Sequence, residues 1–505
     1  TFALKDSGWY NSNDANRNDI GARMTVTPAD PNRIYCVLIG NSKANDKDFI
    51  GIYRSNDGGN HWTNAYGQDG GPYTSNHPNL ATYQDTTGFD QGYYNLSIAA
   101  SHTNADDLLV GFLSLWKSTD GGTTYEKIGG YGGSLDWVHP DQQDMKALGN
   151  DVWLSNDGGV AYSSDFFQSH ESRKNGIIAS EYWGFGQGWN EDIVVGGRYH
   201  NGNSGYKQDT YPTGDHLRLG GAEASTGYVN PGNNLCYFSD ICTIKLPDDF
   251  NEDAQCAGNL EEYPNESYYD TRSGEVEFHP YCYNYIYVSK EDKIYFSKNG
   301  GAGFDVLYEF GTDPADEVYA MEISRSNPLV MYAVQQLTNT TSTVWKTTDG
   351  GANWTALTVP TGPSNRVITG LALDAQDENI LWISAGRATN DGNKVWQSVN
   401  GGTTWNNITS TTLATHKARN LVAQQGTNGL VYLATDKGVF YRDNSMSDWQ
   451  LYNSGLPAFA ASNIMHPFYK KSKLRLATYG YGIWEAPFVQ PSAPIAQPTV
   501  DKLES

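Results

Sequence analysis

The chain has 505 residues, with 34 Lys and Arg against 57 Asp and Glu, and a net charge of −23. A surface this acidic repels phosphate groups, which argues against nucleic acid and anionic membranes as partners and favours cations, neutral glycans or basic protein patches. Only 18% of the residues are charged, whereas 13% are aromatic and 54 are Gly, a profile that predicts short strands joined by polar turns.

The chain starts at Thr1 without a leader-like segment, and it contains no run of about 18 apolar residues that could span a membrane. We therefore expect the processed form of an exported protein, secreted or displayed at the cell surface, with no membrane insertion.

The five cysteines fit that expectation. Cys36 lies in an apolar run and is predicted to be a buried free thiol. The other four are close together in the sequence and predict two local disulfides. Three pairings can be drawn, of which Cys236–Cys242 with Cys256–Cys282 is favoured.

An eight-residue frame recurs along the chain. It begins with Ser or Thr, has Asp or Asn two residues on, continues with Gly-Gly and ends with an aromatic residue. Its copies are Ser55–Trp62, Ser118–Tyr125, Ser155–Tyr162, Ser297–Phe304, Thr347–Trp354 and Ser398–Trp405.

The residue types of the frame predict a hairpin turn. Asp or Asn can accept hydrogen bonds from the backbone N–H groups ahead of it, and the Gly pair supplies positive φ angles. The aromatic residue opens the next strand and provides apolar surface for packing. We therefore predict structural turn roles for Asp57, Asp120, Asp157, Asn299, Asp349 and Asn400.

Each frame belongs to a larger unit of four short strands, as in Val367–Ile408. Eight such units are recognisable between residues 22 and 488, and the stretch between Asp157 and Asn299 is long enough for two degenerate ones. Radial stacking of four-stranded antiparallel units predicts an all-β protein, a β-propeller of about ten blades in one ring. Seven or eight blades, or two smaller rings, are the alternatives.

The expected domains are the propeller, residues 1–488, and a Pro-rich linker, residues 489–505, that leads towards a further C-terminal domain. A ring needs a closing strand, and we expect the N-terminal segment around Phe2–Leu4 or Trp9–Tyr10 to complete the last blade beside Ile483–Trp484.

The frame resembles the Asp-box, or BNR repeat, of sialidases, sortilin-type receptors and xyloglucanase-type glycoside hydrolases. The motifs Gln91–Asn95, Leu115–Ser118, His139–Gln143 and Gly196–Gly197 before Asn201-Gly202 are more similar to the sortilin-like propellers of large surface proteins exported by the type IX secretion system. Those proteins typically carry PKD modules and a C-terminal sorting domain, which the resemblance implies as partners within a longer protein.

The chain departs from that group at Gln143, where His is usual, and at Tyr199-His200, where Gln-Asp is usual. A sialidase is not expected, because Arg33-Ile34 is followed by Tyr35 and no arginine triad is recognisable.

Ligand contacts are expected in loops on the axial face, between residues 67 and 275, where the frame is interrupted. Aromatic faces beside amides and carboxylates suit sugar rings, and Tyr- and Asn-rich loops also bind proteins. For any single Trp the alternative is packing between blades, and for His139 and Asp141 it is a structural hydrogen-bonded pair. The candidates are Tyr93, Tyr94, Trp137, His139, Asp141, Gln143, Trp189, Arg198, Tyr199 and His200.

No cofactor is expected, although the acidic stretch near Asp248 could bind Ca²⁺ through oxygen ligands. The predicted function is a secreted, cell-surface binding or adhesion propeller that recognises a glycan or protein ligand. A glycan-active enzyme of the xyloglucanase type is the alternative; it needs two carboxylates about 5–9.5 Å apart across a groove, a pair that sequence spacing does not identify. A structural spacer is a third reading.

Overall fold

The computed structural model describes residues 4–5, 7–9, 18–41, 49–67, 73–83, 90–135, 138–177, 179–189, 191–198, 201–221, 226–266, 274–311, 313–337, 341–360, 367–386, 391–457, 460, 462–491, 500–501 and 503. Across these ranges, helical structure is limited to the short 3-10 turns η2 (Thr412–Thr415) and η3 (Tyr469–Lys471). None of the helical turns in the described ranges approaches the length or apolar character needed to cross a membrane.

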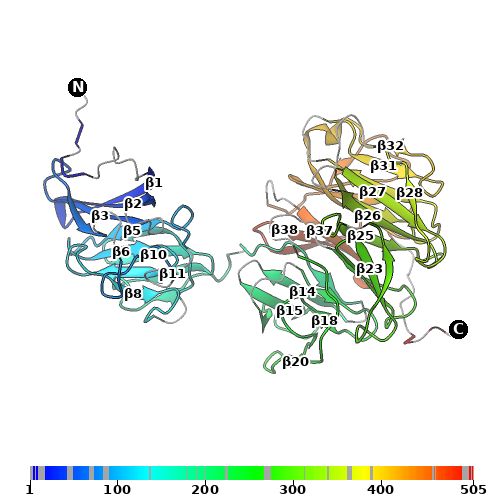
Figure 1. The fold of residues 1–505 in the computed structure, drawn as a ribbon, viewed down its shortest axis with the longest axis horizontal. Helices are drawn as coiled ribbons and strands as arrows, with labels where there is room; N and C mark the ends of the chain where they lie inside the picture. Colours follow the sequence, from blue (N-terminus) through cyan, green and yellow to red (C-terminus); the bar gives the residue numbers. More distant parts are fainter. Residues whose placement is uncertain are drawn as a thin grey trace. The chain divides into compact units, whose positions relative to one another are not determined.

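Ten antiparallel sheets make up the described chain, nine of four strands and one of three, and the strands of each sheet are consecutive in sequence (Figure 1). This arrangement is the multi-blade, all-β propeller that the repeats predict. The sheets divide over two compact units, residues 1–177 and 178–505.

The first unit holds three sheets. Their strands are β1 (Asn18–Thr27), β2 (Asp30–Asn41), β3 (Phe49–Ser55) and β4 (Thr63–Tyr66); β5 (Ser97–Ala100), β6 (Leu108–Gly111), β7 (Leu115–Ser118) and β8 (Glu126–Gly129); β9 (Gln142–Leu148), β10 (Asp151–Asn156), β11 (Gly159–Ser163) and β12 (Glu171–Ser172).

The second unit holds the other seven sheets. Their strands are β13 (Gly186–Gln187), β14 (Ile193–Arg198), β15 (Gly202–Lys207) and β16 (Leu217–Gly220); β17 (Tyr228–Val229), β18 (Cys236–Tyr237), β19 (Ile244–Lys245) and β20 (Gln255–Cys256); β21 (Val276–Phe278), β22 (Ile286–Lys290), β23 (Lys293–Ser297) and β24 (Asp305–Glu309); β25 (Val318–Ile323), β26 (Met331–Leu337), β27 (Thr341–Thr347) and β28 (Thr355–Leu357); β29 (Ile368–Leu373), β30 (Leu381–Ala385), β31 (Val395–Ser398) and β32 (Asn406–Asn407); β33 (Ala418–Ala423), β34 (Val431–Thr435), β35 (Gly438–Arg442) and β36 (Gln450–Leu451); β37 (Ser462–Phe468), β38 (Lys473–Thr478) and β39 (Ile483–Pro487).

Burial follows strand position in the sheets of β29–β32 and β33–β36. The second strands β30 and β34 are buried along their whole length, because both of their faces pack against neighbouring sheets. The fourth strands β32 and β36 are only two residues long and exposed. Short, exposed outer strands limit edge-to-edge pairing with other molecules.

The seven sheets of the second unit form a closed cycle of contacts. Each sheet packs on the next in sequence through its first strand, as between β25 and β29 and between β29 and β33. The last sheet then meets the first: the Gly482 N–H donates to the Ser180 carbonyl at 2.8 Å, and the His466 ring contacts the Phe185 carbonyl at 2.9 Å. Tyr182, Phe185, Val194 and Ala477 form a shared buried cluster there.

A buried ion pair reinforces this closure. Arg475 of β38 pairs with Asp192, which lies just before β14, and the side chains of both are almost completely buried. Lys471 approaches the other Asp192 oxygen at 2.7 Å, and the Arg475 guanidinium lies 4.1 Å from the centre of the Phe468 ring.

These contacts correct two expectations. The ten sheets are not arranged as one ring, because seven of them close among themselves within one unit. Trp9 does not complete the last blade either: it packs on Tyr53 and Trp62 in the first sheet, and the Trp62 N–H donates to the Ser7 carbonyl at 2.7 Å, while Phe2, Ala3 and Tyr10 lie outside the described residues.

Five of the six frames share the hydrogen bonds of their first residue, Ser or Thr, and each joins the third strand of its sheet to the fourth. In Ser398–Trp405, the Ser398 hydroxyl donates to Asn400 at 3.0 Å and accepts from the Gly402 N–H at 2.9 Å. The Gly pair has φ angles of 67° and 84°, which only Gly adopts without strain. In the copy at Asp57, hydrogen bonds from His61 hold the pKa of the carboxyl below its usual range.

Asp157 is the exception, because its turn lies at a different place in the sheet. It lies in the tight turn between β10 and β11, the second and third strands of the sheet. The frame position between the third and fourth strands is taken by Ser163 and Asp165. Although Phe166 and Phe167 replace the Gly pair there, both adopt φ angles of 56°.

The Asp165 turn has the full set of frame hydrogen bonds. The Ser163 hydroxyl donates to Asp165 at 2.8 Å and accepts from the Phe167 N–H at 2.8 Å. Burial opposes ionisation of Asp165, but hydrogen bonds from Ser169, Ser163 and Gln168 lower its pKa to about 2.

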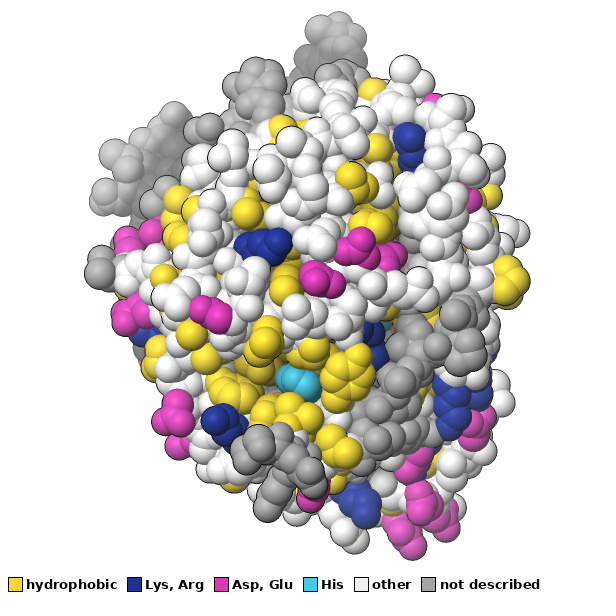
Figure 2. Space-filling model, turned by 90° about the vertical axis from the view of Figure 1, so that its right-hand side faces the viewer, with side chains coloured by type: hydrophobic (Ala, Val, Ile, Leu, Met, Phe, Trp, Pro, Cys, Tyr) yellow, Lys and Arg dark blue, Asp and Glu magenta, His cyan; other side chains and the backbone are white. Residues whose placement is uncertain are grey.

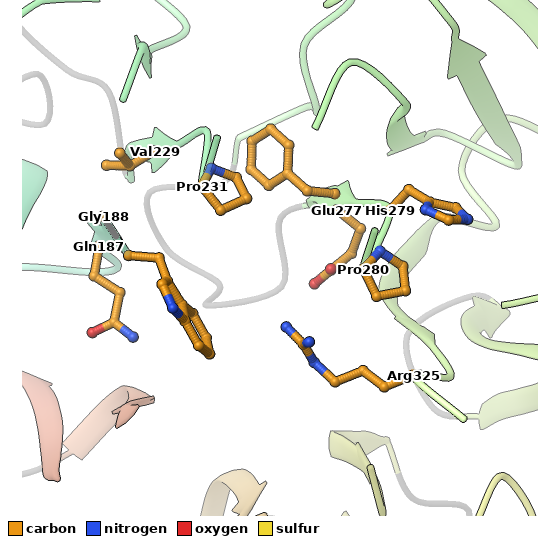
Figure 3. A pocket seen from close by; sticks show the side chains of 10 residues that line it. Gln187, Gly188, Val229, Pro231, Glu277, His279, Pro280 and Arg325 are labelled. Carbon is orange, nitrogen blue, oxygen red and sulfur yellow. The ribbon is translucent and has the colours of Figure 1, made fainter. Parts of the chain in front are cut away.

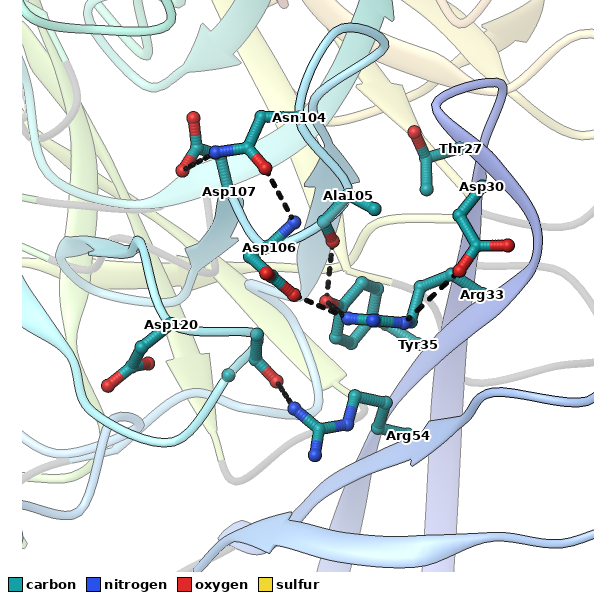
Figure 4. Close-up of polar contacts among 12 residues, drawn as sticks. Thr27, Asp30, Arg33, Tyr35, Arg54, Asn104, Ala105, Asp106, Asp107 and Asp120 are labelled. Atoms are coloured by element: carbon teal, nitrogen blue, oxygen red, sulfur yellow. Dashed lines mark hydrogen bonds and ion pairs between the residues drawn. The ribbon is translucent and has the colours of Figure 1, made fainter.

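Adjacent sheets are linked through the frame turns (Figure 4). Arg54 in β3 donates to the Gly121 carbonyl in the next sheet's frame at 2.8 Å, and its cross-strand neighbour Tyr35 donates to the Ala105 carbonyl at 2.6 Å. Arg33 also pairs with Asp106 at 2.7 Å.

The disulfide also differs from expectation. Cys242 is bonded to Cys256, while Cys236 and Cys282 are buried thiols, so the favoured pairing is wrong; Cys36 is buried as predicted. In the predicted linker, the Val489 N–H donates to the Tyr432 hydroxyl at 2.9 Å, and Val500 pairs with Cys282.

The Ser163→Ala variant should lower the free energy of unfolding by about 1–3 kcal/mol, because it leaves the buried Phe167 N–H without its acceptor. Ser155→Ala is the matched control: its hydroxyl makes only a 3.4 Å contact with the Asp144 carbonyl, and it should change stability by less than about 0.5 kcal/mol. Urea unfolding measures both. Equal losses, or a larger loss for Ser155→Ala, would place the frame where the sequence alone suggests it.

The Arg475→Met variant should destabilise the second unit by about 3 kcal/mol, because buried Asp192 would lose Arg475 and keep only Lys471 as a charge partner among the described residues. Arg173→Met removes an exposed ion pair with Glu171 and should cost less than about 1 kcal/mol. Thermal unfolding followed by circular dichroism compares the two. A melting curve of Arg475→Met that overlays the wild type would show that closure does not depend on this pair.

Candidate functional site

The C-terminal ends of four first strands converge on one cavity in the second unit. It has a volume of about 240 Å³ and is lined from β13, β17 and β21 and from the turn that follows β25 (Figure 3). We call it the channel-mouth cavity, because the first strands are the innermost strands of the closed cycle. Its lining residues are Gln187, Gly188, Trp189, Val229, Pro231, Glu277, Phe278, His279, Pro280 and Arg325.

An indole ring and a guanidinium group lie together in this cavity. The Arg325 guanidinium lies 5.4 Å from the centre of the Trp189 ring, within the range of a cation–π contact. The Trp189 ring also lies 5.8 Å from the Tyr469 ring. In Figure 3, the side chains of Glu277 and Arg325 extend towards each other across the cavity.

Three carboxyl groups influence one another at this site. Glu275 and Glu277 come from the β21 region and Glu322 from β25, and Glu275 accepts a hydrogen bond from the Met321 N–H at 3.0 Å. Burial, with repulsion from neighbouring carboxylates, raises the pKa of Glu322 to about 8 and that of Glu277 well above its usual range. Burial alone raises the pKa of Glu275 to about 7.

The other two titratable groups that line the cavity are His279 and Arg325. Burial lowers the pKa of His279 to about 4, so its imidazole is neutral, and one ring nitrogen accepts from the Tyr281 N–H at 3.2 Å. Burial also lowers the pKa of Arg325, while Glu277 and Glu322 favour its charged form. The cavity therefore offers one guanidinium, the carboxyl group of Glu277 and an aromatic face.

On the molecular face that Figure 2 shows, hydrophobic side chains gather around a histidine, and acidic and basic side chains are scattered around them. An apolar area with a few convergent polar groups is the usual composition of a ligand site.

Several sequence-predicted residues meet elsewhere, in the first unit. Asn95 donates to Asp141 at 2.7 Å, and Gln143 donates to Asn95 at 2.9 Å and to Asp157 at 3.1 Å. Asn95 and Asp141 are buried, and Asp141 adopts a φ of 68°. These motif residues form a buried polar network.

His139, Tyr93 and Tyr94 lie beside this network. Gly158 approaches His139 so closely that an added Cβ would lie 2.5 Å from the His139 Cβ. Tyr93 and Tyr94 follow Gln91 in a turn that is tied back to Asn95, and both rings are largely exposed. The network thus supports two exposed Tyr rings.

The remaining candidates do not share one site. Trp189 lines the channel-mouth cavity, whereas Arg198 lies at the opposite end of the same sheet, where it pairs with Tyr182. Trp137, Tyr199 and His200 lie outside the described residues.

Sequence reasoning missed Glu275, Glu277, Glu322 and Arg325. A signal for them exists, because Glu275-Val276-Glu277 and Met321-Glu322-Ile323 put charged residues into strands that are otherwise apolar. Charged side chains are rarely buried without a specific reason.

Within the ranges that the structure describes, no group of three or more His, Cys, Asp or Glu residues is arranged to hold a metal ion. In the acidic stretch where calcium was considered, Asp248 pairs with Lys207 at 2.6 Å.

Comparison with models of known protein families gives no match, and comparison with characterised proteins gives none either. Among solved structures, the extracellular domain of the one component system BT4673 from B. thetaiotaomicron has a TM-score of 0.42 and 10% identity, over 96% of this chain and 61% of that one. A virginiamycin B lyase from Staphylococcus aureus has a TM-score of 0.43 and 14% identity, over 62% of this chain and 96% of that one.

The GH74 enzyme from Niastella koreensis gives a TM-score of 0.28 and 14% identity, over 92% of this chain and 90% of that one. Similarity at this level carries no argument about the activity or the ligand of this chain.

The raised pKa of Glu322 predicts that the folded protein loses stability as the pH rises. An unfolded Glu ionises near pH 4.3, whereas folded Glu322 keeps its proton up to about pH 8, so the native state binds more protons between these values. Stability therefore falls as the pH rises through this window. Glu322→Gln, which stays neutral, should reduce the fall in melting temperature between pH 6 and pH 9 by roughly 3 °C or more.

Glu252→Gln, in an exposed loop of the same unit, serves as the control and should leave that fall unchanged. Identical pH profiles for wild type and Glu322→Gln would show that Glu322 ionises normally in the folded protein.

Proposed function

We propose that this protein is a secreted, cell-surface binding or adhesion propeller whose second unit holds its ligand in the channel-mouth cavity. The observation that carries the proposal is the convergence of an indole ring, a guanidinium and a carboxyl group on one cavity at the ends of successive first strands. These side chains lie at or just after the ends of first strands, each of which pairs with the second strand of its sheet, and contacts such as the one between Arg325 and Trp189 preorganise the site. Preorganised groups lose little conformational entropy when a ligand binds.

Two further observations support an extracellular location and the family. The Cys242–Cys256 disulfide is of a kind that persists in oxidising compartments. The frame turns, together with the motif network around Asn95, Asp141 and Gln143, support a place among the Asp-box, sortilin-like propellers of type IX-exported surface proteins. In such proteins PKD modules and a sorting domain accompany the propeller and would anchor it.

Trp189→Ala should weaken ligand binding by at least about tenfold, because buried aromatic side chains near the centre of a site dominate binding energy. Arrays of glycans and of surface-protein peptides, probed with the purified protein, identify a ligand, and titration calorimetry then compares the variants. Trp153→Ala removes a partly exposed indole from the first unit and should leave binding unchanged.

A hydrolysis screen on every glycan that binds separates binding from turnover. Turnover abolished by Glu277→Gln would establish the glycan-active enzyme instead. Binding that survives Trp189→Ala but is lost in Tyr93→Ala would place the site in the first unit.

A further inference from the structure

The third sheet of the first unit buries one of its faces and exposes the other. Val152 and Leu154 of β10 and Met145 of β9 lie in a buried cluster that they share with strands β5 and β6 of the neighbouring sheet. The alternate residues face outward, and Leu148 is 74% exposed and Trp153 46% exposed. The second strands β6, β30 and β34 are buried along their whole length, so the exposure of β10 is unusual. We call this outward surface of sheet β9–β12 the open face.

The strand register shows which side chains share the open face, because residues directly opposite each other in an antiparallel pair lie on the same side of a sheet. One level across the four strands consists of Lys146, Trp153, Tyr162 and Glu171. The adjacent level consists of Asp144, Ser155, Val160 and Arg173.

The two edges of the open face carry charges in opposite order. At the β9 edge, Lys146 lies 3.2 Å from Asp144, and at the β12 edge, Arg173 lies 2.7 Å from Glu171. Lys146 shares its level with Glu171, whereas Asp144 shares its level with Arg173. Two cations and two anions cancel here on a chain whose net charge is −23, so this face repels a second copy less than the rest of the surface does.

An aromatic pair occupies the centre of the open face. The rings of Trp153 and Tyr162 lie 4.7 Å apart, and the Arg173 guanidinium lies 5.1 Å from the centre of the Tyr162 ring. The Tyr162 hydroxyl donates to Asp151 at 2.5 Å, which fixes this ring in position. Aromatic side chains at the centre and charged side chains around them are typical of protein–protein interfaces.

We propose that the open face binds the open face of a second copy of this chain, about a two-fold axis parallel to the strands. Rotation about such an axis exchanges the β9 edge with the β12 edge and keeps each level opposite itself. Face-to-face packing of sheets with nearly aligned strands is a common arrangement. The rotation brings together three complementary pairs: Lys146 with Glu171 of the partner subunit, Trp153 with Tyr162 of the partner subunit, and Asp144 with Arg173 of the partner subunit.

The area of the open face sets the expected strength of this dimer. Four strands spaced about 4.8 Å apart, each about six residues long, give a surface of roughly 400 Å² on each copy. This area is near the lower limit for specific interfaces, so we expect a dissociation constant of about 10–100 µM. The inference goes beyond the proposed function and does not depend on the channel-mouth cavity.

Sedimentation velocity of the full chain, from about 1 µM to about 300 µM, tests the proposal, and the chain should change from monomer to mostly dimer over this range. Trp153→Ala should weaken dimerisation at least about tenfold, because it removes the central aromatic contact. Tyr83→Ala is the matched control: it removes a ring of similar exposure from another ring pair in the same unit and should leave the dissociation constant unchanged.

Charge reversal tests the orientation of the axis. Lys146→Glu or Glu171→Lys alone places like charges opposite each other twice in a symmetric dimer, and each should weaken dimerisation about tenfold. The two substitutions combined should restore most of the affinity. An axis perpendicular to the strands would instead place Lys146 opposite Asp144 of the partner subunit, and the combination would then be weaker than either single variant.

Three results would overturn the proposal: a chain that stays monomeric at the highest concentration, a dimer that Trp153→Ala does not weaken, or a double charge reversal that restores nothing. The replaced side chains are exposed, so the variants should melt like wild type. A lower melting temperature of monomeric Trp153→Glu would also overturn the proposal, because it would indicate that the same chain covers the open face.

Discussion

A hydrogen bond from a cation in the third strand of one sheet to the frame turn of the next recurs around the molecule. Arg54 reaches the Gly121 carbonyl at 2.8 Å, and Lys117 reaches the Phe166 carbonyl at 2.7 Å. In each case the acceptor is the fourth residue of a frame. The frame turn therefore closes its own hairpin, and its fourth residue also offers a carbonyl oxygen as an acceptor to the preceding sheet. Charge-assisted bonds of this kind are stronger and more directional than neutral ones.

The second unit repeats this contact between Lys346 and the Gly401 carbonyl. Beside it, Tyr332 donates to the Glu378 carbonyl at 2.9 Å, as Tyr35 donates to a backbone carbonyl in the first unit. The junction of the last and first sheets is built differently, because the last sheet has three described strands. There the Arg475–Asp192 pair, with Arg475 on the second strand of the last sheet, joins the two sheets. A buried charge pair at this junction between sheets distant in sequence makes closure specific as well as stable.

The sequence predicts the local turns and strands but does not predict contacts between segments that are far apart in the chain. The frame states its own turn geometry, since Asp, Asn and Gly have strong turn preferences. The frame misleads at Asp157, because the sequence Asn-Asp-Gly-Gly also suits a two-residue hairpin. The turn with the frame hydrogen bonds is not recognisable in the sequence, because Phe166 and Phe167 adopt positive φ angles in place of the Gly pair. The division into two units could not be read from the repeats, since all the sheets are alike and closure depends on contacts between the ends of a long stretch. The disulfide pairing was missed although Cys242 and Cys256 are only 14 residues apart, because the spacing of cysteines does not determine their connectivity.

The candidate site was missed because it contains no conspicuous motif. The sequence predicts ligand contacts in loops rich in Tyr, Asp and His, but the motif residues of these loops form a buried network around Asp141 in the first unit. The channel-mouth cavity is built from ordinary strands in which Glu or Arg replaces an apolar residue. The first strands are the innermost strands of the closed cycle, and there a charged residue such as Glu277 borders the cavity and not the packing between sheets. The frame turns stabilise each sheet through its outer strands. The residue types of the inner strands can therefore differ from sheet to sheet, and these strands supply the cavity.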